Sequence, residues 1–260
     1  MSWDPAQYAK FADLRLRPAL DLLGRVPVES AARVVDLGCG TGNVTEHLAA
    51  RWPAARIVGV DGSPEMLAEA KARRVAMGPG GHLDWQLANL QEWHADQPVD
   101  VLFSNAALHW LGHHDTLFPA LFAQVAPAGV MAVQMPRNFD APSHRIVADL
   151  AAASRWSPQL GDLAKPSPVH PPAAYFAWLT ACGARVAIWE TEYLQPLRGP
   201  RPVLEWIKGT YLRPLLGRLS PAEQHEFEGE YAERAAEAYP ADRDGVTLFP
   251  FRRLFLIAAR

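Results

Sequence analysis

The chain has 260 residues, 49% of them hydrophobic and 20% charged, so it can bury a sizeable core and is not expected to be disordered. Its formal net charge of -3 argues against a general nucleic-acid binder, which usually carries a basic excess. The two cysteines, Cys39 and Cys182, lie far apart and lack metal-ligand spacing. We therefore expect free thiols in a reducing compartment and no metal site.

The N-terminal segment and the apolar runs of the chain do not suggest targeting to a membrane. Residues 1–11 hold an acid, a proline and aromatics but no apolar run, unlike a signal peptide. No later stretch approaches the roughly 20 uncharged apolar residues that a membrane span needs. We expect a cytoplasmic protein with no membrane partner.

The first half of the chain alternates apolar runs with helical patterns. Short β-branched runs at 33–38 and 55–60 are typical of buried parallel strands. Between them Val44, Leu48 and Trp52 recur every four residues, which predicts one buried helix face. Three further strands are expected at 82–88, 99–105 and 129–135.

A second helix should begin at Pro64, with Ser63 as its N-cap and Met66 facing inward. Strands separated by helices in this way predict βαβ units, and hence a parallel sheet with helices on both faces. The fold class is α/β, with residues 31–136 forming the ligand-binding half of the sheet.

The second half predicts two more strands, 184–193 and 253–260, which bring the sheet to seven. Helices are expected from Ser143 to about Trp156 and around Tyr175 to Cys182. The roughly 60 residues between the last two strands are too many for a bare loop. We expect a helical insertion at 194–250 within a single domain, 1–260. Its clearest helix begins with a capping box formed by Ser220 and Glu223.

The run "VVDLGCGTGN" (34–43) places Gly38, Gly40 and Gly42 between the first strand and a helix. Glycines permit positive φ and close approach of a ligand to the main chain, and a helix start offers unpaired N–H groups. A phosphate loop would need lysine and Ser/Thr where Asn43 and Val44 stand. A dinucleotide fingerprint would need its third glycine one residue later. A tight turn that binds nothing is the remaining plain alternative.

Asp61 ends the second strand in "IVGVDGSPEM". A carboxylate at this position can accept hydrogen bonds from both ribose hydroxyls of an adenosine. The alternative is a plain helix N-cap, but Ser63 already fills that role.

The motif D-x-G-x-G-x-G from Asp36 to Gly42 resembles motif I of class I S-adenosylmethionine-dependent methyltransferases. The resemblance implies a Rossmann-like fold, S-adenosyl-L-methionine as methyl donor and S-adenosyl-L-homocysteine as product. It also implies a ribose contact from Asp61. An acidic residue is expected near the adenine, where this chain has Asn89, whose oxygen still accepts hydrogen bonds. Further donor contacts implied in this way are Gly62, Met66, Leu90 and Asn105.

Several segments between residues 3 and 258 resemble the trans-aconitate 2-methyltransferase family. They include "SNAALHWL", "AVQMPRNFDAPSH", "TYLRPLL" and "FPFRRLFLIA", and they extend into the expected insertion. One departure is Leu14, where an acidic residue is expected.

The resemblance implies transfer of a methyl group to one carboxylate of trans-aconitate, giving a monomethyl ester. A carboxylate with a pKa near 4 is already ionised at neutral pH, so no general base and no catalytic residue beyond positioning groups are expected. The insertion would cover the substrate and exclude water. The sequence does not reveal the oligomeric state; a monomer is plausible.

A tricarboxylate calls for arginines that bind carboxylates bidentately. Arg213 is the first candidate, because Tyr211 and Pro214 flank it, and Arg252 and Arg253 come next. For each of them, a merely solvated surface arginine is the alternative.

The segment after the fourth strand should form the floor where donor and acceptor meet. His109 and Trp110 are expected there beside Asn105, although His109 is equally explained as a packed structural residue. At the N-terminus, Tyr8 and Arg17 resemble residues that close over the donor. Arg17 would bind a carboxylate of donor or acceptor, unless its helix merely packs on the sheet.

Two other functions stay open on the sequence alone. One is carboxyl O-methylation of another small acid or of a malonyl-carrier thioester. The other is a donor-binding scaffold or regulatory domain without enzymatic activity.

Overall fold

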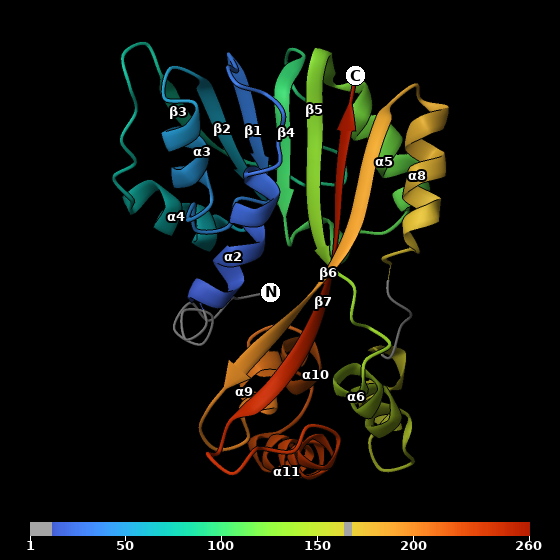
Figure 1. Cartoon of the computed structure of the whole chain (residues 1–260). Coiled ribbons are helices and arrows are strands. Elements are labelled where there is room, and N and C mark those ends of the chain that lie inside the picture. The colour runs from blue at the N-terminus through green and yellow to red at the C-terminus, as the bar shows by residue number, and fades with distance from the viewer. Residues whose placement is uncertain (1–11, 164–167) are drawn as a thin grey trace. The chain divides into compact units, whose positions relative to one another are not determined.

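A computed structural model of the chain describes residues 12–163 and 168–260. Its central feature is a seven-stranded sheet with the strand order β3-β2-β1-β4-β5-β7-β6 (Figure 1). The mostly parallel sheet of a Rossmann-like α/β fold is thereby confirmed. The strands are β1 (Arg33–Leu37), β2 (Arg56–Asp61), β3 (His82–Leu87), β4 (Val99–Asn105), β5 (Val125–Pro136), β6 (Arg185–Leu197) and β7 (Thr247–Ala259).

Neighbouring strands from β3 to β5 pair in parallel, whereas β7 pairs antiparallel with β5. The order of the strands reverses between β1 and β4. In open α/β sheets, ligands bind beyond the carboxyl ends of the strands at such a reversal. The topology therefore predicts a ligand site at the carboxyl ends of β1, β2, β4 and β5.

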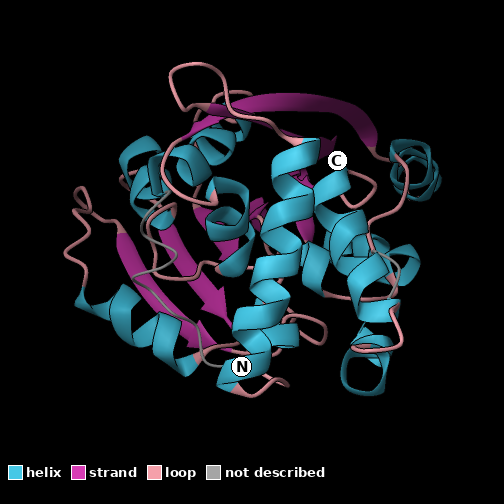
Figure 2. Cartoon of the chain, turned by 90° about the horizontal axis from the view of Figure 1, so that it is seen from below, coloured by secondary structure: helices cyan, strands magenta, loops and turns pink. Residues whose placement is uncertain are grey.

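Helices, drawn in cyan in Figure 2, connect the strands. Helices α3 and α4 pack against β2, and α5 packs against β5 and α8. The α-helices are α2 (Ala12–Leu23), α3 (Thr45–Arg51), α4 (Pro64–Ala72), α5 (His114–Ala123), α6 (Pro142–Ala152), α7 (Ser157–Leu160), α8 (Pro172–Ala181), α9 (Pro202–Lys208), α10 (Arg213–Leu216) and α11 (Pro221–Ala238). Two short 3-10 helices are η1 (Leu108–Trp110) and η2 (Gly161–Leu163).

The internal contacts of the chain divide it into two compact units. The sheet unit consists of Arg15–Pro136, Pro168–Thr191 and Arg253–Arg260. The helical unit consists of the remaining segments, and its described parts are residues 12–14, 137–163 and 192–252. It thus includes a segment after β5 as well as the expected insertion. Whether the chain folds as one domain, and whether the insertion covers a ligand, stay predictions.

Three strands are longer than their sequence patterns indicate, among them β5, which already begins at Val125. Strand β6 continues to Leu197 and β7 already begins at Thr247. From Thr247 to Arg253 buried and more exposed side chains alternate along β7, while the rest of the strand is buried almost continuously. Pro250 lies within the alternating part, where it is typical of a loop or an edge rather than of a strand. The expected insertion therefore has strands, not helices, at both ends.

The core of the sheet unit is a continuous apolar cluster between the sheet and helices α5 and α8. Leu37, Leu102, Phe118, Met131 and Leu254 are each fully buried in it. Burial of one such side chain contributes about 1.5–3 kcal/mol. This packing makes the carboxyl ends of the strands a rigid platform.

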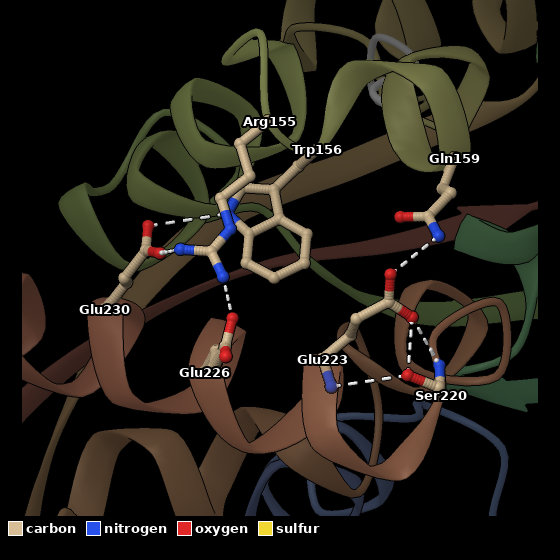
Figure 3. A network of polar contacts seen from close by, with 7 residues as sticks. All are labelled: Arg155, Trp156, Gln159, Ser220, Glu223, Glu226 and Glu230. Carbon is tan, nitrogen blue, oxygen red and sulfur yellow. Dashed lines mark hydrogen bonds and ion pairs between the residues drawn. The ribbon is translucent and has the colours of Figure 1, made fainter.

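The helical unit is held together by α11 packing against α6 and α9. Phe227 and Tyr231 form the predicted buried stripe of α11, and the ring of Trp156 meets Phe227 edge-on at 5.4 Å. Figure 3 shows Arg155 lying over Trp156 and pairing with Glu226 and Glu230 of α11. An aromatic contact and ion pairs thus join the segment after β5 to the insertion.

The predicted capping box at the start of α11 is confirmed (Figure 3). Ser220 Oγ accepts the Glu223 N–H at 3.4 Å, and the Glu223 carboxylate accepts the Ser220 N–H at 2.8 Å. Gln159 donates to the other carboxylate oxygen at 2.9 Å. The hydrogen bonds from Gln159 and Ser220 lower the pKa of Glu223 to about 2.

None of the helices in the described ranges combines the length and the apolar character needed to cross a membrane.

Replacement of Ser220 by alanine should lower the free energy of unfolding by about 0.5–2 kcal/mol, because the first turn of α11 loses its cap. Denaturant unfolding monitored by tryptophan fluorescence measures this change. Ser220→Thr is the matched control, since it retains the hydroxyl and should stay close to wild type. Equal stability of Ser220→Ala and wild type would show that the cap contributes nothing.

Candidate functional site

Polar residues follow one another along the carboxyl edge of the sheet unit, in the order of the strands. Asp61 ends β2, Asp36 lies near the end of β1, and Asn105 ends β4. Gln134 of β5 is the register partner of Asn105. The bend at residues 36–42, which joins β1 to α3, lies in the middle of this row.

The three glycines of the bend all have positive φ, but each meets different surroundings. A Cβ on Gly38 would lie 2.1 Å from the Cβ of Ala107, and a Cβ on Gly42 would lie 2.6 Å from the ring of Trp85. A Cβ on Gly40 would have no described atom within 4 Å. Gly38 and Gly42 thus allow close packing within the protein, whereas Gly40 leaves its main chain open to a ligand.

Asp61 fixes the position of the bend. Its Oδ2 accepts the Gly40 N–H at 2.8 Å, and its Oδ1 accepts the Ser63 N–H at 2.9 Å. The N-cap of α4 is Ser63, whose Oγ accepts the Met66 N–H, as predicted. Because each carboxylate oxygen has two lone pairs, both oxygens of Asp61 can still accept a hydroxyl of a ligand.

Asp36 is a buried carboxyl beneath the bend, and its Oδ2 accepts the Thr45 hydroxyl at 2.6 Å. Burial raises the pKa of Asp36 to about 7; the hydrogen bond from Thr45 opposes this rise, and the charge of Asp61 adds to it. A positive charge placed at the bend would favour the ionised carboxylate. The site is therefore suited to a ligand that carries a cation next to a sugar or another pair of hydroxyls.

The loop after β4 is held firmly beside the bend. Ser104 Oγ donates to the Leu37 carbonyl at 2.7 Å, which joins the ends of β4 and β1. Ala106 has a φ of 52°, a conformation that non-glycine residues seldom adopt and that occurs often at functional sites. The strain is consistent with a loop whose shape is set by its neighbours.

His114 supports the same loop from below. Its Nε2 contacts the Leu108 carbonyl at 3.0 Å, and its Nδ1 contacts the hydroxyl of Tyr175 at 2.6 Å. A carbonyl only accepts, so Nε2 carries the proton and Nδ1 accepts from Tyr175. Burial lowers the pKa of His114. A neutral His114 thus fixes η1, which carries His109 and Trp110.

His109 and Trp110 lie together on η1, with their ring centroids 4.7 Å apart. Trp110 is 46% exposed, which is unusual for tryptophan and leaves a large apolar surface available to a ligand. The role of His109 as a ligand contact stays a prediction.

The residues expected around an adenine occupy the side of the bend next to β3. The Leu90 side chain lies 3.5 Å from the Cβ position of Gly38, and Met66 is buried on α4. Asn89 is exposed, and its Oδ1 already accepts the Gln91 N–H at 3.1 Å. Gly62 is exposed directly after Asp61. Their roles as ligand contacts stay predictions.

The expected N-terminal contacts are only partly visible. Arg17 is an exposed residue of α2. Tyr8 lies outside the described residues, as does the rest of segment 1–11 of the N-terminal cap that we expect at 1–30.

The three candidate arginines have different environments. In the helical unit, Arg213 Nη1 is buried and has no hydrogen-bond partner among the described residues. Arg252 is half-exposed and 4.0 Å from Glu192, whereas Arg253 is 4% exposed and donates to Gln134 at 3.3 Å. Successive residues of a strand point to opposite faces, so Arg252 and Arg253 do not serve the same side of the sheet.

Two polar residues of this site escaped the sequence analysis. Thr45 lies three residues after Gly42, and only the fold shows that its hydroxyl meets Asp36. Gln134 is the one polar side chain in the apolar run 129–135, and a buried amide in a central strand was the signal for it. No group of His, Cys, Asp or Glu within the described part of the chain is arranged to hold a metal ion.

Comparison with known proteins defines the class to which this arrangement belongs. Residues 34–129 match a family model described as a methyltransferase domain. An S-adenosylmethionine-dependent methyltransferase from Mesorhizobium loti is 20% identical with a TM-score of 0.53, covering 93% of this chain and 96% of its own. The cyclopropane synthase MmaA2 from Mycobacterium tuberculosis is 16% identical with a TM-score of 0.57, covering 94% and 83%. The fold is that of the class I methyltransferases.

Curated relatives narrow the class to one family. The trans-aconitate 2-methyltransferase of Streptomyces avermitilis is 50% identical, over 99% of this chain and 96% of the relative. The protein of the same name from Methylobacterium nodulans is 48% identical, over 99% and 98%. The chain belongs to the trans-aconitate 2-methyltransferase family.

The distinct surroundings of the glycines predict distinct effects on stability. Gly40→Ala should lower the free energy of unfolding by about 1 kcal/mol, because alanine is disfavoured at positive φ. Gly38→Ala should lower the free energy of unfolding by about 1–3 kcal/mol more than Gly40→Ala does, because its Cβ collides with Ala107. Urea denaturation of both variants measures the difference. Equal losses of stability would contradict the close packing of Gly38.

Proposed function

We propose that this protein is an S-adenosylmethionine-dependent carboxyl O-methyltransferase that converts trans-aconitate into a monomethyl ester. The observation that carries the proposal is the open bend at Gly40, tied to Asp61 at 2.8 Å, in a chain of this family. The products are the ester and S-adenosylhomocysteine.

The bend and its neighbours bind the donor. Gly40 allows the ligand to approach the main chain, Asp61 accepts the ribose hydroxyls, and the carboxylate of Asp36 faces a cationic ligand from below. Burial raises the pKa of Asp36 to about 7, and a cationic donor held at the bend would favour its ionised form. The remaining donor contacts are Tyr8, Arg17, Gly38, Gly42, Gly62, Met66, Asn89, Leu90 and Asn105.

Bound S-adenosylmethionine supplies a methyl group on a sulfonium: a carboxylate oxygen forms the new C–O bond while the C–S bond breaks and its electron pair stays on sulfur. An acceptor carboxyl with a pKa near 4 is already ionised at neutral pH, so the protein needs no general base. Its contribution is to hold the oxygen in line with the methyl group. Such positioning is worth on the order of 7–11 kcal/mol.

The acceptor is a small tricarboxylate, bound by arginines and by the loop after β4. Arg213 is the first candidate in the helical unit, since its buried Nη1 has no partner among the described residues. His109, Trp110, Arg252 and Arg253 are the other candidates. An action in the cytoplasm, without nucleic acid or membrane, is part of the proposal, and the net charge of -3 supports the absence of nucleic acid.

The proposed donor site predicts a loss of affinity in a variant that still folds. Gly40→Ala should weaken S-adenosylhomocysteine at least 10-fold, because its Cβ occupies the space of the ligand and not of the protein. Calorimetric titration measures the affinity. Glu69→Ala, which removes an exposed side chain of α4, is the control. If Gly40→Ala bound S-adenosylhomocysteine with wild-type affinity, the donor would not bind at the bend.

The choice of acceptor is tested with a panel of acids and methyl-labelled donor. We expect trans-aconitate to be methylated once, with the mass of its monomethyl ester, in preference to citrate, to a saturated tricarboxylate and to a malonyl-carrier protein. A carboxylate pKa below neutrality also predicts that the rate is not limited by acceptor deprotonation between about pH 6 and 8. Turnover of the malonyl carrier but not of trans-aconitate would overturn the proposal.

A further inference from the structure

Gln134 is a buried amide at the carboxyl end of a central strand. It lies on β5 with none of its surface exposed. Its register partners are Asn105, the last residue of β4, and Phe255 of β7. Since register partners on adjacent strands point to the same face of a sheet, the side chains of Gln134 and Asn105 are neighbours.

The orientation of this amide is fixed by Arg253. Arg253 Nη1 donates to Gln134 Oε1 at 3.3 Å. A guanidinium has donors only, so the oxygen of the amide faces it and the nitrogen points the other way. That nitrogen, Nε2, is buried and has no hydrogen-bond partner in the part of the chain that the structure describes. A buried donor in this condition requires an explanation.

The position of Gln134 relative to the bend explains this unpaired donor. Along the sheet the order is β2, β1, β4, β5 and β7, so Asp61 and the bend come first, then Asn105, then Gln134 and Arg253. Asn105 Oδ1 is also buried without a partner among the described residues. An orphan acceptor thus lies next to the bend and an orphan donor one strand farther away.

We propose that Gln134 Nε2 donates a hydrogen bond to a carboxylate of the acid that is methylated, with Arg253 as the positioning residue that aims the amide. The chemistry selects this ligand: a neutral N–H donor beside a buried guanidinium suits a carboxylate oxygen and disfavours a cation. The inference rests on the proposed function and deepens it, since it adds a specificity-determining contact on β5 to those of the candidate arginines.

Two variants of Gln134 test the contact. Gln134→Met keeps the length and packing of the side chain but cannot donate, and it should raise the KM for trans-aconitate about 10- to 100-fold, the value of a hydrogen bond to a charged group. Gln134→Glu should raise the KM further, because it adds a negative charge facing the substrate. In both, the affinity for S-adenosylhomocysteine should stay within about twofold of wild type and kcat should fall less than KM rises.

A binding measurement separates this role from a structural one. A saturated tricarboxylate is titrated into protein saturated with S-adenosylhomocysteine, and its affinity should fall in Gln134→Met by the same factor as the KM rises. Gln97→Met, which removes an exposed amide from the loop before β4, should leave both values unchanged. Arg253→Lys retains a donor for Oε1 of Gln134. It should therefore lose less affinity for the tricarboxylate than Arg253→Met.

The outcomes distinguish the inference from the proposed function. If wild type binds and methylates the acid and Gln134→Met has the same KM and tricarboxylate affinity, the contact from Nε2 does not exist. A lower melting temperature with an unchanged KM would likewise overturn it and leave Gln134 a packing residue. If wild type methylates no tricarboxylate at all, the proposed function fails first.

Discussion

The hydrogen bond from the Gly40 N–H to Asp61 is the interaction on which the site depends. It joins the end of β2 to the bend after β1 across 2.8 Å, and it holds a glycine whose φ is 54°. Gly38 and Gly42 let Ala107 and Trp85 pack against the same bend. These contacts hold the bend in one shape, and a Cβ on Gly40 would meet no described atom within 4 Å.

Charge is distributed along the sheet edge in a way that matches the proposed reaction. The carboxyl groups of Asp36 and Asp61 lie at β1 and β2, whereas the guanidinium of Arg253 lies at β7, with two neutral amides between them. A cationic donor and an anionic acceptor would each face the opposite charge. The amides of Asn105 and Gln134, which are register partners, lie between these charged groups in the order of the strands.

The sequence predicted those features that depend on residues close together in the chain. The strand at 99–105, the cap at Ser63, the box at Ser220 and the bend all appeared where expected, because each follows from local periodicity or from a local hydrogen bond. The family resemblance extended this to the class of reaction and to the fold.

Features that depend on distant partners were not predictable in the same way. The start of β7 was hidden by Pro250, since its pairing with β6 is not a local property. Residues 137–163 join the helical unit through contacts of Trp156 with α11, about 70 positions later. The opposite directions of Arg252 and Arg253 follow from the true extent of β7. Gln134 became a candidate only once its hydrogen bond with Arg253 and its unpaired Nε2 were known.

A crystal structure of the protein with S-adenosylhomocysteine and a saturated tricarboxylate tests the central claim most directly. The account predicts both ribose hydroxyls within about 2.5–3.2 Å of the Asp61 carboxylate, and the thioether beside the bend. It also predicts that the tricarboxylate lies on the β4 and β5 side of the sulfur. An adenosine bound away from Asp61 and Gly40 would contradict it.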